Sequence, residues 1–255
     1  MIRQRPHVLC LSGHDPSGGA GIHADIEAVG ALGGHALTAI TAYTVQDTDN
    51  VRRVSAAPPI WLAAQIETLL ADVEIHAIKL GLLGSVAQID PILAAIRQLH
   101  VPVVMDPILR AGGGARLVRS ELAEAMRSRL LPAITVLTPN AAEARALTGL
   151  DGEPAAQALL ELGAQQVLVT GGDEPGEEVQ NHWHRAGEAA RRYSWPRLDD
   201  RFHGAGCTLA AALATLLARG ETVEAAIEGA QRYTHQALSR AYAVGQGRKI
   251  PGRRP

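Results

Sequence analysis

Three glycine-rich turns hold the residues of this sequence that could do chemistry. They are Gly13 to Gly21, Arg110 to Gly114, and His203 to Cys207. A turn that leads into a helix can bind an anion, because its backbone N–H groups are unpaired and lie at the positive end of the helix dipole. None of the three has the Gly-Lys-Ser/Thr ending of a P-loop or the full dinucleotide fingerprint. Each one alone is equally well interpreted as a tight connection, since glycine suits any corner with positive φ.

The third turn is more informative, because Cys207 follows Gly204, Ala205 and Gly206 at the start of a predicted helix. Backbone amides there could hold the charge that spreads over a transferring phosphoryl group. The same field is expected to lower the pKa of the Cys207 thiol, which would suit it as a base or polariser for an alcohol. The alternative is a small residue packed under the helix, and the spacing alone favours that alternative.

The elements that must position these turns follow a βαβ rhythm, in which strand-length apolar runs alternate with segments of helical period. Continuous apolar strands predict a mostly parallel sheet covered by helices on both faces, an α/β protein. A hairpin at the sheet edge is expected on either side of Ala186 to Glu188. The expected strands are 8–11, 37–43, 75–80, 101–105 and 134–137, and the expected helices are 22–32, 61–70, 86–99, 120–130, 206–219 and 223 to about 243.

Composition limits the class of protein. With 255 residues, 47% of them hydrophobic and 20% charged, the chain is predicted to form one compact domain over residues 1–255, with a frayed tail at about 245–255. A net charge of −2 with interspersed signs gives no basic face for nucleic acid or an anionic membrane. Cys10 and Cys207 form no paired framework. We therefore expect a reducing cytoplasm, and neither a signal peptide nor a membrane span.

The stretch from Leu11 to Asp25 resembles the opening motif of the hydroxymethylpyrimidine/phosphomethylpyrimidine kinases, the thiamine-biosynthesis branch of the ribokinase-like superfamily. It reads Leu-Ser-Gly-His-Asp-Pro-Ser-Gly-Gly-Ala-Gly-Ile-His-Ala-Asp. Collinear matches make chance a poor explanation, and they lie at 41–46, 79–83, 104–107, 137–143 and 204–209.

The resemblance implies a ribokinase-like three-layer α/β/α sandwich, usually a homodimer, that uses ATP with Mg²⁺. The implied reaction is phosphorylation of 4-amino-5-hydroxymethyl-2-methylpyrimidine to its monophosphate and then to the pyrophosphate. A monovalent cation requirement is left open by the sequence.

On the acceptor side, the family's pattern implies contacts between the pyrimidine and a set of six residues. A carboxylate and an amide can together bind the donors and acceptors of an aminopyrimidine. The alternative for the carboxylate, Asp25, is a solvated acid in the first turn of a helix, favoured by the helix dipole. The six residues are Gly13, Ala20, Asp25, Gln46, Leu82 and Ile108.

On the phosphate side, the resemblance places Cys207 as the catalytic base in an anion hole made by Gly204, Ala205 and Gly206. Asn140 and Glu143 would help to order Mg²⁺ and the nucleotide phosphates, with Glu143 acting through water. Mg²⁺ prefers such hard oxygen ligands. The same two residues are equally typical of a helix cap followed by an acid in the first turn. Asp106, at the end of a predicted buried strand, would be a third acid near the phosphates.

Three positions depart from the family's pattern. Ala205 stands where threonine is common, which leaves the backbone amides in place. A lysine often found after the Asp-Pro segment is absent, and Gly112 aligns with it, so Arg110 is the candidate for the missing charge. Thr170, shortly before Gly172, stands where lysine is common, and both are expected beside the nucleotide.

Two other functions stay open at this point. One is a vitamin B6 kinase of the same fold, acting on pyridoxal or pyridoxine. The other is a non-catalytic ligand-binding module, against which the intact Gly206-Cys207 pair, Asn140 and Glu143 argue, because a pure binder does not need phosphoryl-transfer groups.

Overall fold

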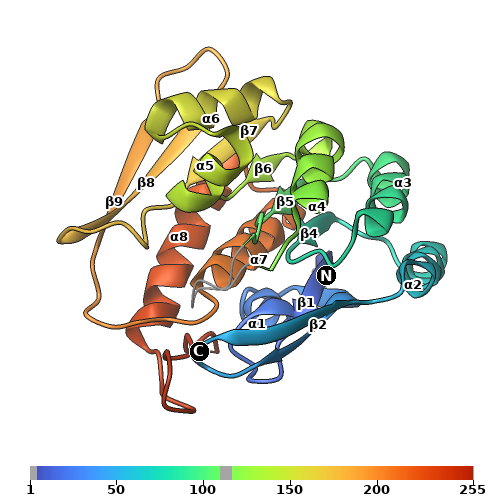
Figure 1. The fold of residues 1–255 in the computed structure, drawn as a ribbon, viewed down its shortest axis with the longest axis horizontal. Helices are drawn as coiled ribbons and strands as arrows, with labels where there is room; N and C mark the ends of the chain where they lie inside the picture. The colour runs from blue at the N-terminus through green and yellow to red at the C-terminus, as the bar shows by residue number, and fades with distance from the viewer. Residues whose placement is uncertain (1–4, 110–116, 255) are drawn as a thin grey trace.

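A computed structural model describes residues 5–109 and 117–254 of the chain. Its centre is a nine-stranded sheet in the order β3-β2-β1-β4-β5-β6-β7-β8-β9 (Figure 1). In this spatial order, neighbouring strands from β2 to β7 are parallel. At the two edges, β3 is antiparallel to β2, β8 to β7, and β9 to β8. The strands are β1 (His7–His14), β2 (His35–Gln46), β3 (Val51–Ala56), β4 (Ala77–Leu80), β5 (Val103–Met105), β6 (Val136–Leu137), β7 (Gln166–Val169), β8 (Glu178–Arg185) and β9 (Arg191–Pro196).

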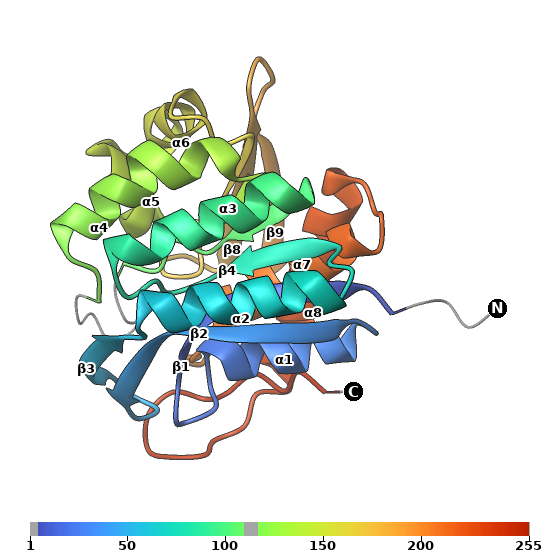
Figure 2. The ribbon, with the colours of Figure 1, turned by 90° about the vertical axis from the view of Figure 1, so that its right-hand side faces the viewer.

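Helices cover both faces of the sheet (Figure 2). One core cluster joins a face of the sheet to α1, α7 and α8, and the other joins the opposite face to α2, α3, α4, α5 and α6. The predicted three-layer α/β/α sandwich, including the edge hairpin β8–β9, is confirmed. The helices are α1 (Gly21–Ala31), α2 (Pro59–Asp72), α3 (Ile89–Leu99), α4 (Ser120–Ala125), α5 (Ala141–Thr148), α6 (Gly152–Glu161), α7 (Ala205–Ala218) and α8 (Val223–Ser239), with short helical turns at Val86–Gln88, Met126–Leu130 and Leu131–Ala133.

The helix α7 packs against the central strands β1, β4 and β5, and its small side chains explain how it can lie close to them. Every residue from Cys207 to Leu217 is buried, and many of them are alanine, which lets the helix axis approach the strands. Because this helix begins at the carboxyl ends of the parallel strands, it brings the third glycine turn to the edge where the first turn also lies.

The elements α5, α6, β7 and β3 are not among the expected ranges, and the C-terminal tail also differs from the expectation. The strand β3 was not predicted, because it is an edge strand whose Arg52, Arg53 and Ser55 are exposed and whose pattern is only weakly apolar. The tail expected to fray is packed instead: Ile250 and Arg253 are buried, and Ile250 pairs with Tyr242. Within the described part of the chain, none of the helices combines the length and apolar character that a bilayer crossing demands.

Candidate active site

The first turn of α7 brings Cys207 against Asp106, which follows β5. Gly204, just before the helix, has φ +88°, and an added Cβ would lie 2.0 Å from the carbonyl oxygen of Gly19. Only glycine fits this corner, both for its backbone conformation and for its closeness to the first turn. Gly206, the residue before Cys207, lies against Asp106, because an added Cβ would meet Asp106 Oδ2 at 3.2 Å, and the Cys207 thiol lowers the pKa of this carboxyl as a hydrogen-bonding neighbour. The structure thus unites a thiol, a carboxylate and a helix N-terminus, which is a set suited to proton and phosphoryl transfer.

The thiol of Cys207 is neutral in this environment. Its pKa is raised to about 12, mainly by burial; the charge of Lys79 opposes this rise, and the negative charges of Asp106 and Asp25 add to it. The expectation of a lowered pKa was therefore wrong, because it considered the helix dipole and not the burial of the side chain. Burial also raises the pKa of Asp106, while Lys79 and the thiol hydrogen bond lower it. Asp106 is the natural acceptor for a proton that passes through Cys207.

A buried ion pair lies beneath this site. Lys79 on β4 donates hydrogen bonds to Ser12 Oγ, at 2.9 Å, and to Asp25 Oδ2, at 3.0 Å. Ser12 Oγ donates to the same Oδ2 at 2.5 Å. Asp25 Oδ1 lies 2.8 Å from Lys79 Nζ as an ion-pair contact, but it has no hydrogen bond of its own. The interpretation of Asp25 as a solvated acid is wrong, since its side chain is completely buried.

Lys79 was not among the predicted site residues, although the sequence contains a signal for it. It is a lysine between Ile78 and Leu80 in an otherwise apolar strand, and this strand ends directly before Gly81. A lysine in a fully buried strand needs a partner, and the partner is Asp25 on α1. Burial alone would lower the Lys79 pKa, but Asp25, Cys207 and Asp106 raise it above its ordinary value, so the ammonium stays charged.

The remaining acceptor-side residues lie along the same edge of the sheet. Leu82 covers the end of β1, because a Cβ added at Gly13 would meet its Cδ2 at 3.1 Å. Ile108 is half-buried two residues after Asp106, and its N–H donates to the Asp106 carbonyl at 2.9 Å. Gln46 ends β2, four residues beyond the partner of Gly13, so it lies further out on this edge. The direct contacts of Gly13, Ala20, Asp25, Gln46, Leu82 and Ile108 with a pyrimidine stay predictions.

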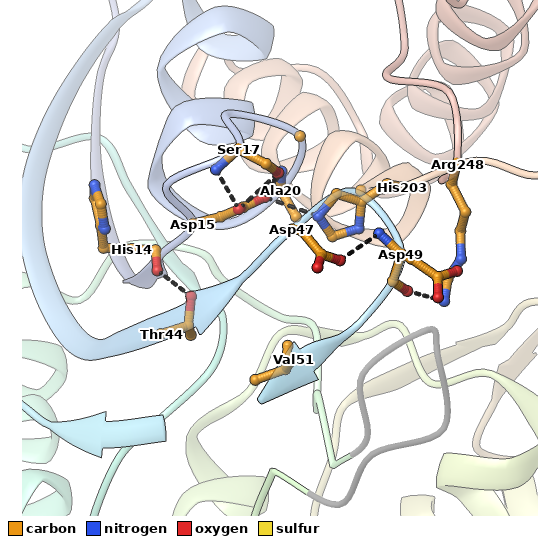
Figure 3. Close-up of polar contacts among 12 residues, drawn as sticks. His14, Asp15, Ser17, Ala20, Thr44, Asp47, Asp49, Val51, His203 and Arg248 are labelled. Atoms are coloured by element: carbon orange, nitrogen blue, oxygen red, sulfur yellow. Dashed lines mark hydrogen bonds and ion pairs between the residues drawn. The ribbon is translucent and has the colours of Figure 1, made fainter. Parts of the chain in front are cut away.

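The first glycine turn is tied to the third through Asp15 and His203 (Figure 3). Asp15 Oδ2 accepts from the N–H of Ala20 and lies 2.8 Å from His203 Nε2. Asp15 Oδ1 accepts from the N–H and the hydroxyl of Ser17, both at 2.8 Å. The pair was not predicted, because the two residues are 188 positions apart and only the folded chain shows that they meet.

On the nucleotide side, Asn140 and Glu143 form the cap of α5. Asn140 Oδ1 accepts from the N–H of Glu143 at 2.8 Å, and Glu143 Oε2 accepts from the N–H of Asn140 at 3.0 Å. The alternative of a helix cap is confirmed, because each side chain accepts a hydrogen bond from the backbone N–H of the other residue. Burial raises the pKa of Glu143, and the charge of Asp106 raises it further.

The other predicted nucleotide residues follow the next strand, β7. Thr170 forms a bridge with Asn140, and the carbonyl of Gly172 accepts a hydrogen bond from Arg197 at 3.0 Å. Asn140 Nδ2 also donates to Asp173 at 3.1 Å. Arg110, the proposed substitute for the missing lysine, lies outside the described residues together with Gly112.

The acids of this side fit a hydrated Mg²⁺ ion. Asp106 raises the pKa of the buried Glu143, a repulsion that a bound cation would relieve. Within residues 5–109 and 117–254, no three acidic, histidine or cysteine side chains gather around one point. Mg²⁺ usually binds through one or two carboxylates and keeps several waters, so Glu143 and Asp106 are suitable donors.

Comparison with known proteins agrees with this chemistry. The phosphomethylpyrimidine kinase family profile matches residues 15–251. A hydroxymethylpyrimidine/phosphomethylpyrimidine kinase of Streptomyces coelicolor is 36% identical over 95% of this chain and 92% of its own length. A thiamine biosynthesis bifunctional protein of Geobacter sulfurreducens is 37% identical over 95% of this chain and 51% of its own length. The structure of Bacillus subtilis pyridoxal kinase in an ADP complex superposes with a TM-score of 0.87, at 30% identity, over 97% of this chain and 96% of that one.

Proposed function

The chain belongs to the phosphomethylpyrimidine kinase family, and on this premise we propose that it phosphorylates 4-amino-5-hydroxymethyl-2-methylpyrimidine with ATP. We propose further that it converts the monophosphate to the pyrophosphate, as a step of thiamine biosynthesis. The observation that supports this most directly is the packing of Asp106 against the start of α7, where a Cβ added on Gly206, next to Cys207, would meet Asp106 Oδ2 at 3.2 Å. A thiol that is linked to a carboxylate beside an anion-binding turn suits an alcohol kinase.

In the first step, the hydroxymethyl oxygen attacks the γ-phosphorus of ATP. The new O–P bond forms as the bond from that phosphorus to the β-phosphate oxygen breaks, and ADP leaves. The alcohol proton goes to the Cys207 sulfur as the thiol proton passes to Asp106. The backbone N–H groups of Gly204 to Cys207 stabilise the charge on the transferring group. Lys79, which stays buried and charged, lowers the pKa of Asp106 and so helps to keep this carboxylate ionised and able to take the proton.

We propose that Glu143 holds Mg²⁺ through water, with Asn140 and Asp106 nearby. When bound, Mg²⁺ neutralises charge on the nucleotide phosphates. Thr170 and Gly172 are placed beside the nucleotide in this proposal, and Arg110 beside the second phosphate.

Three further features belong to the same proposal. They are a homodimeric assembly, a cytoplasmic location, and a monovalent cation that acts alongside Mg²⁺.

A vitamin B6 kinase is the second candidate, because the Bacillus subtilis structure that matches this fold closely is a pyridoxal kinase. The pyrimidine is favoured by the family match over most of the chain and by Gln46, whose amide suits an aminopyrimidine edge.

The deciding experiment is a coupled assay of purified protein with ATP and Mg²⁺, in which hydroxymethylpyrimidine and pyridoxal are compared as acceptors. We expect kcat/KM to be higher for the pyrimidine. A higher value for pyridoxal would make this a vitamin B6 kinase. ATP turnover that does not respond to either acceptor would leave the ligand-binding module as the better description.

A further inference from the structure

The C-terminal tail, defined here as residues 245–254, ends in a buried arginine that contacts two turns of the active site. The side chain of Arg253 is only 1% exposed. Its Nε donates to Thr208 Oγ1 at 2.8 Å, and its Nη2 donates to the carbonyl of Gly19. Thr208 Oγ1 in turn donates to the carbonyl of Gly204 at 2.7 Å. One guanidinium therefore joins the first glycine turn to the residue that follows Cys207.

The charge of Arg253 is balanced from α1. Its Nη1 lies 3.1 Å from Glu27 Oε2. The backbone around it is also fixed, because its carbonyl accepts from the Tyr233 hydroxyl at 2.8 Å and the N–H of Gly252 donates to Ala237 at 2.8 Å. A buried charge with this many partners is held in a single position.

The same tail also contacts the connection between β2 and β3, next to Gln46. The N–H of Arg248 donates to the carbonyl of Thr48 at 3.0 Å. The guanidinium of Arg248 donates to the carbonyl of Asp49, also at 3.0 Å (Figure 3). Gly247 lies so close that an added Cβ would come within 2.5 Å of the carbonyl carbon of Thr48. The tail thus reaches the far end of the predicted acceptor site.

A third contact links the tail to the segment before the anion hole. The N–H of His203 donates to the carbonyl of Lys249, and the N–H of Lys249 donates to the carbonyl of Arg201, both at 2.9 Å. His203 itself pairs with Asp15 of the first turn. The first glycine turn, the connection between β2 and β3, and the segment before the anion hole are therefore all tied to the C-terminal tail.

We propose that Arg253 is a positioning residue, which together with its tail holds the acceptor-binding segments in register with the anion hole at Cys207. This rests on the proposed kinase function. The side-chain hydrogen bonds of Arg253 go to Gly19, Thr208 and Glu27, so it acts by fixing Gly19 and Thr208 relative to each other. Small displacements of a bound acceptor from the attacking geometry reduce the rate steeply, by about a hundredfold for 1 Å.

The test is the variant Arg253→Lys in the full chain, compared with Arg254→Lys. Lysine keeps the charge, but its single nitrogen cannot reproduce a guanidinium that spans Gly19, Thr208 and Glu27. Arg254 is a matched control, because it is the next residue, it also pairs with Glu27, and its side chain is 81% exposed. It lines a cavity of about 360 Å³ with His23 and Glu27 on α1.

We expect Arg253→Lys to lower kcat for pyrimidine phosphorylation about tenfold to a hundredfold, with the KM for ATP within twofold of wild type. The ratio of ADP to phosphorylated pyrimidine should rise above one, because water can replace a misaligned acceptor. Arg254→Lys should match wild type in both quantities. The melting temperature of each variant is measured alongside.

A second variant keeps the proposal falsifiable if Arg253→Lys does not fold. Gly247→Ala should displace Thr48 and raise the KM for the pyrimidine, without changing the KM for ATP.

Four outcomes would be informative. An inactive wild-type protein refutes the proposed function itself. An active wild type with equal kinetics for Arg253→Lys and Arg254→Lys overturns the positioning role alone. A loss of activity that follows the loss of folded protein, with the ADP ratio at one, also overturns it. A folding failure of Arg253→Lys combined with wild-type kinetics for Gly247→Ala does the same.

Discussion

The Nζ atom of Lys79 lies 2.8 Å from Oδ1 of Asp25, and both side chains are completely buried. Lys79 comes from the middle of the sheet and Asp25 from a helix that covers it. Removing either partner would leave an isolated charge in the interior, which costs far more than the pair contributes when it is intact.

We therefore expect Asp25→Ala to lower the free energy of unfolding by about 3–5 kcal/mol. From the sequence alone, the expected effect was mainly a higher KM for the pyrimidine. Urea titration followed by circular dichroism measures the difference. The control is the double variant Asp25→Leu, Lys79→Met, which removes both charges and should recover much of the stability. If Asp25→Ala is as stable as wild type and only its pyrimidine KM rises, Asp25 is a ligand-binding residue first.

This ion pair also shows how far the sequence could predict the site. The motifs predicted that Gly13, Asp106, Asn140, Glu143 and Cys207 would lie near strand ends, because parallel strands place all their carboxyl ends at one edge. Which side chains pair there depends on the register of strands and helices that are far apart in sequence. Composition and spacing do not determine that register.

The tail and the thiol were mispredicted for a related reason. Glycine, proline and arginine at the C-terminus are typical of a frayed end, yet each nitrogen of the buried Arg253 guanidinium has a hydrogen-bond acceptor. For Cys207, the dipole of α7 can be predicted from sequence, whereas the depth of burial that raises its pKa cannot. Both errors concern tertiary contacts, while the alternation of strands and helices was predictable from local patterns.

The raised pKa of Cys207 predicts slow alkylation. With a pKa of about 12, only a minute fraction of the thiol is ionised at neutral pH, and iodoacetamide reacts with the thiolate. Peptide mapping after incubation at pH 7.5 should show little modified Cys207, and the rate should still be increasing above pH 9. Short denatured peptides containing the same cysteine provide the reference. Faster labelling of the native protein than of the peptide would mean that the helix field dominates after all.

The pairing of Asp15 predicts a pH-dependent contribution to stability. Burial raises the pKa of Asp15, but the hydrogen bonds from His203 and Ser17 outweigh it and lower the pKa below the ordinary value of 3.8. The native state then binds this proton more weakly than the unfolded chain, so the stabilisation is present above pH 3.8 and is lost as the pH falls through the native pKa.

The variant Asp15→Asn tests this, since it keeps the shape and removes the charge. Its free energy of unfolding should be about 1–3 kcal/mol below that of wild type at pH 6, as expected for loss of a charged hydrogen-bond partner. The difference should shrink below pH 4. A difference that stays constant from pH 6 to pH 3 would assign the effect to packing instead of ionisation.

The two proposed phosphorylation steps should respond oppositely to two substitutions. In the second step, the monophosphate presents an anionic oxygen in place of the alcohol, so no proton has to pass to the Cys207–Asp106 pair. Cys207→Ala should therefore reduce the first step by about a hundredfold to ten-thousandfold and the second step much less. The added negative charge needs a cation, and with glycine at position 112 the candidate is Arg110, which lies outside the described residues. Arg110→Ala should reduce the second step more than the first.

Separate assays that start from the alcohol and from the monophosphate, with products resolved by ion-exchange chromatography, give both rates for each variant. Arg119→Ala is a suitable control, because Arg119 is an exposed arginine at the start of α4. Equal losses in both steps for Cys207→Ala would mean that the thiol acts on the nucleotide and not on the acceptor proton. If the wild-type protein makes only the monophosphate, the second step does not occur at this site, and the role assigned to Arg110 falls with it, while the role of Cys207 in the first step is still tested by the alcohol assay.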